Sequence, residues 1–144
     1  MRPWLVVALA VSCDQVTKFL VLHFLRPAQS VPLIPSVVHL TYVQNTGAAF
    51  GLFRGYPGAF ALLSIGVAGW ILLELRRSHV HHRRAPLELA LILGGAIGNL
   101  IDRLRVGYVI DFIDLRVWPV FNVADSCITI GVGLLLWRTL IPRR

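Results

Sequence analysis

Residues 4–25 read WLVVALAVSCDQVTKFLVLHFL, a nearly continuous apolar run that is interrupted by Asp14 and Lys18. A helix needs about 20 mostly apolar residues to cross the hydrocarbon core of a membrane. Three further stretches have a similar character, at residues 56–75, 86–102 and 121–141. We therefore predict four transmembrane helices, all within a single domain that covers residues 1–144.

The composition supports this interpretation. Apolar residues make up 56% of the 144 residues and charged residues 15%, whereas soluble domains average about 45–50% and about 25%. A soluble domain of this size would have to expose large apolar patches, so we expect contact with membrane lipid. The net charge of +7 would suggest nucleic acid in a soluble protein. In a membrane protein it reflects loops that face an anionic lipid surface, and we expect no nucleic-acid partner.

Loop charges predict the orientation of the helices. Residues 76–85 form a short loop between the second and third spans, with a dense basic cluster at Arg76, Arg77, Arg83 and Arg84. The positive-inside rule places such a loop in the cytoplasm. With four spans, both termini then lie in the cytoplasm, and the loops 26–55 and 103–120 lie outside.

The outer loops carry the remaining structural signals. Residues 37–43, VVHLTYV, are β-branched and aromatic, which predicts a strand of a small sheet at the outer interface. Apolar residues surround Asp111 in the second outer loop, which predicts an interfacial segment there. The expected fold class is therefore an all-α polytopic membrane protein with four transmembrane helices, a small extracytoplasmic β-sheet and a short interfacial helix.

Ionisable side chains are rare inside membranes, so each of them is a functional candidate. Asp14 and Lys18 lie four residues apart on one helical face and can neutralise each other in the bundle interior. A structural pair and a direct chemical role both remain open for them. Gly94 and Gly98 form a face of small residues that allows a neighbouring helix to approach closely.

Polar residues also gather at the expected outer end of the third span. Asn99 is spaced from Asp102 and Arg103 so that all three side chains project to one side of the helix. Asp125 lies one turn into the fourth span, with Asn122 one turn earlier on the same face. Because the third and fourth helices are antiparallel neighbours, we expect Asp111 and Asp125 to meet at the outer end of the bundle.

Two carboxylates in one site of low dielectric constant share a proton at neutral pH. One of them can take a proton from a water that attacks a carbonyl, while the other polarises that carbonyl. No metal and no cofactor is needed for this chemistry. From spacing alone, a small proton- or cation-coupled transporter subunit remains an alternative, because acids in membranes often serve transport. A transporter would place its acids across the membrane depth, whereas a pair at one face favours hydrolysis.

Five sequence blocks resemble those of bacterial lipoprotein signal peptidase, also called signal peptidase II. They occur in the order of that family and extend from the first span to the fourth. The blocks are DQVTK (14–18), NTGAAF (45–50), GNLIDR (98–103), VIDF (109–112) and FNVADS (121–126).

The resemblance implies an aspartyl endopeptidase of the bacterial cytoplasmic (inner) membrane, with its active site near the outer leaflet. Such an enzyme removes the signal peptide from diacylglyceryl-modified prolipoproteins by cutting just before the lipidated cysteine. The resemblance further implies inhibition by globomycin-type compounds, and we expect a monomer. The strand at residues 37–43 is expected to pair with an extended stretch of substrate.

The resemblance also assigns roles to individual positions. Asp111 and Asp125 correspond to the catalytic pair. Asn45 and Arg103 correspond to positions that contact the substrate or the inhibitor, and Gly47 lies in the same block as Asn45. The supporting residues implied by the resemblance are Asn99 and Asn122, with Asp14 and Lys18 as a structural or assisting pair.

Overall fold

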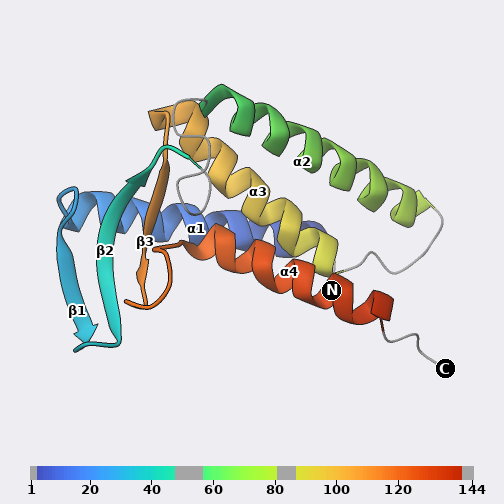
Figure 1. Ribbon diagram of the computed structural model, residues 1–144. Coiled ribbons are helices and arrows are strands. Elements are labelled where there is room, and N and C mark those ends of the chain that lie inside the picture. Colours follow the sequence, from blue (N-terminus) through green and yellow to red (C-terminus); the bar gives the residue numbers. More distant parts are fainter. Residues whose placement is uncertain (1–2, 48–56, 81–86, 141–144) are drawn as a thin grey trace.

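The computed structural model describes residues 3–47, 57–80 and 87–140. These residues form four helices and a three-stranded sheet (Figure 1). In chain order the elements are α1 (Pro3–Phe24), β1 (Ser30–Ile34), β2 (Val38–Asn45), α2 (Pro57–Val80), α3 (Leu87–Val106), β3 (Val109–Asp114) and α4 (Val123–Leu140).

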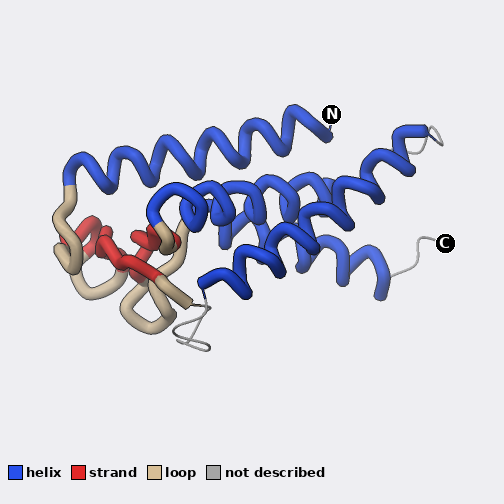
Figure 2. Tube along the Cα trace, turned by 90° about the horizontal axis from the view of Figure 1, so that it is seen from above, coloured by secondary structure: helices blue, strands red, loops and turns tan. Residues whose placement is uncertain are grey.

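The helices lie side by side with the sheet at one end of the bundle (Figures 1 and 2). α1 and α3 run toward the sheet, and α2 and α4 run away from it. α3 is the central helix and packs against the other three. The start of α1 and the end of α4 both lie at the end of the bundle far from the sheet, as an even number of spans requires.

Local sequence signals explain where several helices begin and end. Pro3 and Pro57 are the first residues of α1 and α2, where a missing backbone N–H costs little. α3 ends at Val106, and the next residue is Gly107, whose φ of 82° is accessible to glycine without strain. The Gly107 N–H donates to the carbonyl of Arg103 at 3.2 Å and closes the last turn.

The helices approach closely through the glycines of α3. A Cβ on Gly94 would lie 2.6 Å from the Ala10 Cβ, and one on Gly98 would lie 2.5 Å from a carboxylate oxygen of Asp14. Both contacts are made with α1, so the predicted face of small residues is confirmed. The opposite face of α3 meets α4 in the same way, through Gly95 and the carbonyl of Ala124.

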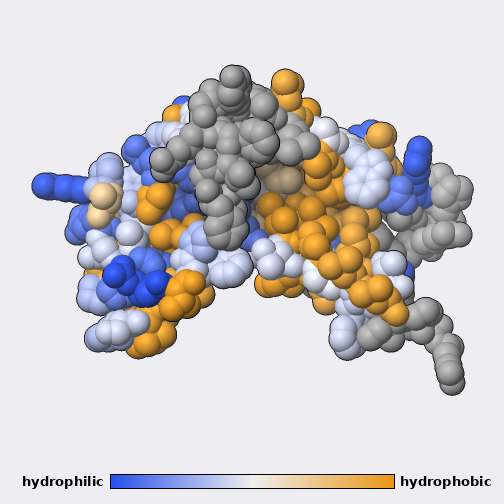
Figure 3. All heavy atoms as spheres, in the orientation of Figure 1, coloured by the Kyte–Doolittle hydropathy of each residue, from blue (hydrophilic) through white to orange (hydrophobic). Residues whose placement is uncertain are grey.

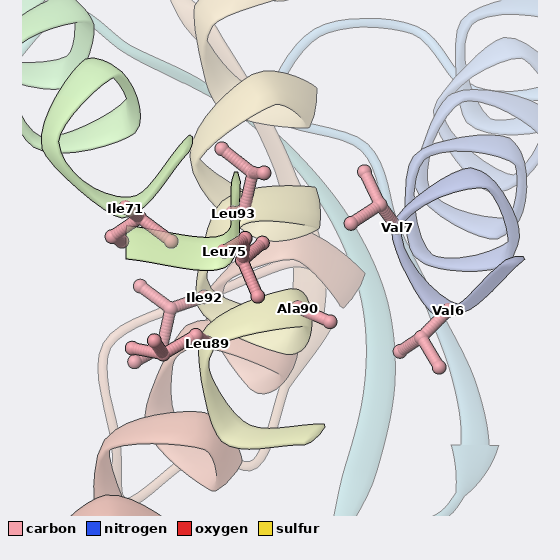
Figure 4. Packing of buried hydrophobic residues seen from close by; sticks show 8 residues of the cluster. All are labelled: Val6, Val7, Ile71, Leu75, Leu89, Ala90, Ile92 and Leu93. Atoms are coloured by element: carbon pink, nitrogen blue, oxygen red, sulfur yellow. The ribbon is translucent and has the colours of Figure 1, made fainter. Parts of the chain in front are cut away.

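Aliphatic side chains fill the space between α1, α2 and α3 at the end far from the sheet (Figure 4). This cluster consists of Val6, Val7, Ile71, Leu75, Leu89, Ala90, Ile92 and Leu93. A second cluster joins the end of α1 to the sheet and consists of Val21, Tyr42, Ile110 and Phe112. The sheet is therefore anchored on α1 through one of its faces.

β2 is the central strand and pairs antiparallel with β1 and β3. Val43 lies opposite Asp111, and Asn45 lies opposite Val109. Because alternate residues of a strand share a face, Asn45 and Asp111 lie on the same side of the sheet. The expected pairing of residues 37–43 with substrate would need a free strand edge. β2 has a partner strand on each side, so its paired residues offer no such edge.

The structure corrects two other expectations. Residues 109–114, expected as an interfacial segment, form the strand β3, in which β-branched and aromatic residues satisfy their backbone groups by pairing with β2. A short interfacial helix is absent from the described residues. The expected loop at residues 76–85 is helical as far as Val80, and residues 81–86 lie outside the described part of the chain.

Two helices among the described residues, α1 and α4, are long and apolar enough to cross a membrane. Apolar surface gathers over the helices, while more hydrophilic surface collects at the sheet end (Figure 3). Exposed large side chains on the helices include Phe19, Trp70 and Trp137. A surface of this kind suits lipid better than water.

Candidate active site

A cavity of about 880 Å³ opens where the sheet meets the helices. Its walls come from β2, α3, β3, the segment after β3 and the first turns of α4. Six of the residues singled out from the sequence line it: Asn45, Gly47, Asn99, Arg103, Asp111 and Asp125. The structure thus brings together side chains that are spread over most of the sequence.

Asp111 projects from β3 and is only 1% exposed. The Asn45 side chain donates to one carboxylate oxygen at 2.8 Å, and the Asn122 side chain donates to the other at 2.7 Å. Burial, the largest cause, and the nearby charge of Asp125 together raise the pKa of Asp111 to about 7, against the lowering effect of the Asn45 and Asn122 amides and of Lys18. The Asp111 carboxyl group can therefore gain or lose a proton near neutral pH.

Asp125 is held by the residues that start α4. The Asp125 backbone N–H donates to the Asn122 side-chain oxygen at 2.8 Å, and the Asn122 backbone N–H donates to Asp125 Oδ2 at 3.3 Å. This reciprocal arrangement is a capping box, with Asn122 as the N-cap and Asp125 three residues later. The other carboxylate oxygen accepts a hydrogen bond from the Asn99 side chain at 2.7 Å.

Asn99, which lines the cavity, and Asn122, which lies behind it, link the two carboxylates. Asn122 Nδ2 donates both to Asp111 Oδ1 and to Asn99 Oδ1, at 2.7 Å and 3.1 Å. Asn122 is fully buried and its side chain has a partner at each end. The expected convergence of Asp111 and Asp125 therefore appears in the structure as one shared hydrogen-bond network.

Asn45 and Arg103 also line the cavity. The Gly47 N–H donates to Asn45 Oδ1 at 3.0 Å, and this tight turn aims the Asn45 NH₂ group at Asp111. Arg103 is half-buried on α3 and interacts electrostatically with both Asp125 and Asp111. A cationic group therefore faces the cavity beside the two acids.

Asp14 and Lys18 form the expected buried pair, with the ammonium 2.9 Å from a carboxylate oxygen. A third member, Asp102, was not predicted as a partner of Lys18 and lies 2.7 Å from the same ammonium. Asp102 and Asn99 both contact Lys18, and Asn99 and Arg103 line the cavity, so Asn99 connects the ion cluster to the cavity. Gln15 was also missed and donates to both Asp14 and Asp102. A signal was present, because Lys18 is the one lysine of the sequence and both Asp14 and Asp102 fall within the predicted spans.

Asp114, on the same strand as Asp111, has a different environment. Thr41 donates to its carboxylate at 2.7 Å, and the backbone and side chain of Arg116 donate as well. These hydrogen bonds, with that of Thr41 the strongest influence, lower the pKa of Asp114. Asp114 is therefore held as a structural anion, and Asp111 is the acid of this strand that is suited to proton transfer.

Comparison with known proteins agrees with this description. A family model described as signal peptidase (SPase) II matches residues 6–141. A lipoprotein signal peptidase of Moorella thermoacetica is 49% identical over 141 residues, which is 97% of this chain and 94% of the relative. A lipoprotein signal peptidase of Halothermothrix orenii is 44% identical over 138 residues, 94% of each chain. A bacterial membrane enzyme solved by the in meso method at 2.3 Å shares 32% identity, with a TM-score of 0.84 over 96% of this chain and 87% of that chain.

The fold is that of a bacterial membrane enzyme, and the class of protein is a membrane-associated peptidase. Within that class the chain belongs to the signal peptidase II family. Its function is accordingly that of a lipoprotein signal peptidase. The alternative of a transporter subunit has no support in these similarities.

Proposed function

We propose that the chain is an aspartic endopeptidase in which Asp111 and Asp125 are the catalytic pair. The observation that carries this proposal is the position of Asn122, which is hydrogen-bonded to both residues behind one shared cavity. A pKa near 7 for Asp111 suits a group that must both accept and release a proton during turnover.

The chemistry needs one proton shared between the two acids. The ionised carboxylate takes a proton from water as the water oxygen attacks the peptide carbonyl, and the protonated carboxyl group donates to the carbonyl oxygen. When the tetrahedral intermediate collapses, the C–N bond breaks and the leaving nitrogen takes up a proton from the pair. Asn45, Asn99 and Asn122 hold the carboxylates in place through these steps.

The proposed substrate is a prolipoprotein that carries a diacylglyceryl-modified cysteine, cut just before that cysteine. The cavity offers both kinds of surface that such a substrate requires. Asn45 and Arg103 can donate hydrogen bonds to peptide and ester groups, and the backbone at Gly47 lies in the same wall. Apolar side chains suited to acyl chains line the remainder, among them Val43, Leu115, Phe121 and Ile128.

We further propose that all four helices span the bacterial cytoplasmic membrane as one domain that acts as a monomer. The sheet and the cavity then lie at the outer leaflet, and both termini lie in the cytoplasm. The position of the sheet at one end of the bundle and of both chain ends at the other supports this arrangement. Cleavage at the membrane surface reduces the cost of unwinding a substrate helix, whose backbone groups are otherwise paired.

The experiment is cleavage of a prolipoprotein by the purified protein in detergent or bilayers. We expect release of the signal peptide from the diacylglyceryl-modified precursor, no release from the same precursor with an unmodified cysteine, and inhibition by globomycin. Equal cleavage of both precursors would contradict the proposed substrate. No cleavage of either would contradict the proposed function.

A further inference from the structure

The charge cluster behind the cavity is connected to the backbone beside both candidate catalytic residues. Asp14 Oδ1 accepts a hydrogen bond from the backbone N–H of Ala124 at 2.9 Å. Asp102 Oδ2 accepts one from the backbone N–H of Ile110 at 3.1 Å. Ala124 immediately precedes Asp125, and Ile110 immediately precedes Asp111. The two carboxylates that flank Lys18 therefore fix the chain directly before each member of the pair.

Lys18 is the common element of this cluster. Lys18 is only 1% exposed. Its ammonium group has three acceptors, Asp14 at 2.9 Å, Asp102 at 2.7 Å and Asn99 at 3.0 Å. An ammonium group has three hydrogens and no acceptor capacity, so all of its donors are used. Lys18 is not part of the cavity wall.

The contact with Asn99 determines which way the amide of Asn99 points. Its oxygen accepts from Lys18 Nζ and from Asn122 Nδ2, at 3.0 Å and 3.1 Å. Its NH₂ group therefore faces Asp125 Oδ1, at 2.7 Å. The flipped amide would place NH₂ against an ammonium and oxygen against a carboxylate, which is unfavourable on both sides.

We propose that Lys18 is a positioning residue for the catalytic pair, acting through Asn99 and through the carboxylates of Asp14 and Asp102. This inference rests on the proposed function of Asp111 and Asp125. Lys18 keeps Asn99 as a hydrogen-bond donor to Asp125 throughout turnover and fixes the spacing of the two carboxyl groups. It does so without contact with the substrate.

A double-mutant cycle separates this role from general stabilisation. Lys18→Met and Asn99→Ala are each expected to lower kcat by about tenfold or more, the value of a lost hydrogen bond to a charged group. KM for a diacylglyceryl-modified peptide should change little. If Lys18 acts through Asn99, the double variant is no slower than the slower single variant. Multiplication of the two losses would overturn the proposal.

A second variant addresses folding, because Lys18→Met alone leaves two buried carboxylates without their cation. Asp14→Asn with Lys18→Met removes one positive and one negative charge, and the amide oxygen at position 14 can still accept from Ala124. The matched control is Glu88→Gln with Arg138→Gln, which removes the ion pair of 2.8 Å between α3 and α4 at the far end of the bundle. Thermal unfolding in detergent reports the folding of each protein.

The pH profile supplies a readout that a merely structural residue would not change. The charged groups that face Asp111 are Lys18 on α1, Arg103 on α3 and Asp125 on α4, and on β2 it meets the neutral Asn45. The charge of Lys18 lowers the pKa of Asp111, so its removal should shift the acid limb of kcat to higher pH. The Glu88→Gln/Arg138→Gln control should keep the parental profile.

The outcomes are distinguishable from failure of the proposed function. A parent protein that does not cleave the modified substrate overturns the catalytic pair and the role of Lys18 together. An active parent whose Lys18 variants keep the parental kcat and acid limb overturns the role of Lys18 alone. Loss of folding in both Lys18 variants, with the control pair intact, would make Lys18 a purely structural residue and would also overturn it.

Discussion

Asn122 and Asp125 cap each other at the start of α4, with the Asp125 backbone N–H 2.8 Å from the Asn122 side chain and the Asn122 backbone N–H 3.3 Å from the Asp125 carboxylate. The residues that begin the helix therefore also orient a carboxylate at the cavity. Asn122 has a second duty, because its NH₂ group donates to Asp111. Helix initiation and the geometry of the two acids depend on the same side chain.

Substitution of Asn122 should separate these two duties. Asn122→Ser keeps an N-cap hydroxyl but is too short to reach Asp111, whereas Asn122→Ala removes both contacts. We expect Asn122→Ala to lower stability by about 0.5–2 kcal/mol from loss of the cap and Asn122→Ser to lower it less. Both variants should lose most peptidase activity. Thermal unfolding and turnover are the measurements, and an active Asn122→Ser protein would contradict the bridging role.

The raised pKa of Asp111 predicts how the stability of the folded protein depends on pH. Its pKa in the folded protein, about 7, lies above the reference value of 3.8. The folded state therefore binds more protons than the unfolded state between about pH 4 and about pH 7, and its stability falls as the pH rises through that window. Asp111→Asn should remove this part of the slope when the unfolding temperature is measured from pH 5 to pH 8.

Asp114 provides the control of opposite sign. The pKa of Asp114 in the folded protein is lowered from 3.8. The ionised Asp114 therefore stabilises the fold above pH 3.8, and this stabilisation is lost as the pH falls through the folded-state pKa. Asp114→Asn should destabilise the protein at neutral pH and leave the slope between pH 5 and pH 8 intact. Removal of the slope by Asp114→Asn would mean that the wrong aspartate was assigned.

The contrast between these two acids shows what the sequence predicted and what it did not. The long apolar runs at residues 4–25 and 121–141 predicted α1 and α4 closely, and the spacing of Asp14 and Lys18 predicted their ion pair. The strands β1 and β3 were not predicted, because their pairing with β2 is a tertiary property, and residues 109–114 were expected only as an interfacial segment. Asp102 was missed as a partner of Lys18 because the choice between the α1 and cavity faces of α3 depends on how the helices pack. Asn45 and Gly47 were singled out only through the resemblance to a family, and the roles of the other site residues also depended on it, since spacing alone did not exclude a proton pathway.

Gly98 should be intolerant of a side chain. Its missing Cβ leaves the space that Asp14 occupies, and Asp14 in turn holds the start of α4. Gly98→Ala should therefore lower both thermal stability and activity. Gly133→Ala is the matched control on α4, because a Cβ there meets nothing within 4 Å, and it should be neutral or stabilising by up to about 1 kcal/mol. Equal tolerance of both changes would contradict the close approach of α1 and α3.

Membrane orientation can be tested at two exposed positions. Val37 lies between β1 and β2 at the sheet end of the bundle and is 55% exposed. Arg77 lies near the C-terminal end of α2, far from the sheet. With Cys13 and Cys127 replaced by Ala, a cysteine at 37 should react with an impermeant maleimide in intact cells. A cysteine at 77 should react only after permeabilisation. The reverse pattern would invert the proposed topology.

The proposed catalytic pair makes the strongest claim about activity. Asn in place of Asp111 or Asp125 keeps the size of the side chain but cannot accept and return a proton, so each single change should abolish turnover of a diacylglyceryl-modified precursor. The double change should be little worse than either single change, because groups that act as one unit are not additive.

Asp114→Asn, which removes an acid from the same strand outside the cavity wall, should keep turnover and serves as the control. Chelators should have no effect on the parent protein, because the two carboxyl groups supply both the base and the acid. Near-parental turnover by either Asn variant, with folding verified by thermal unfolding, would remove that residue from the mechanism, and inhibition by a chelator would indicate a metal site in place of the carboxyl pair.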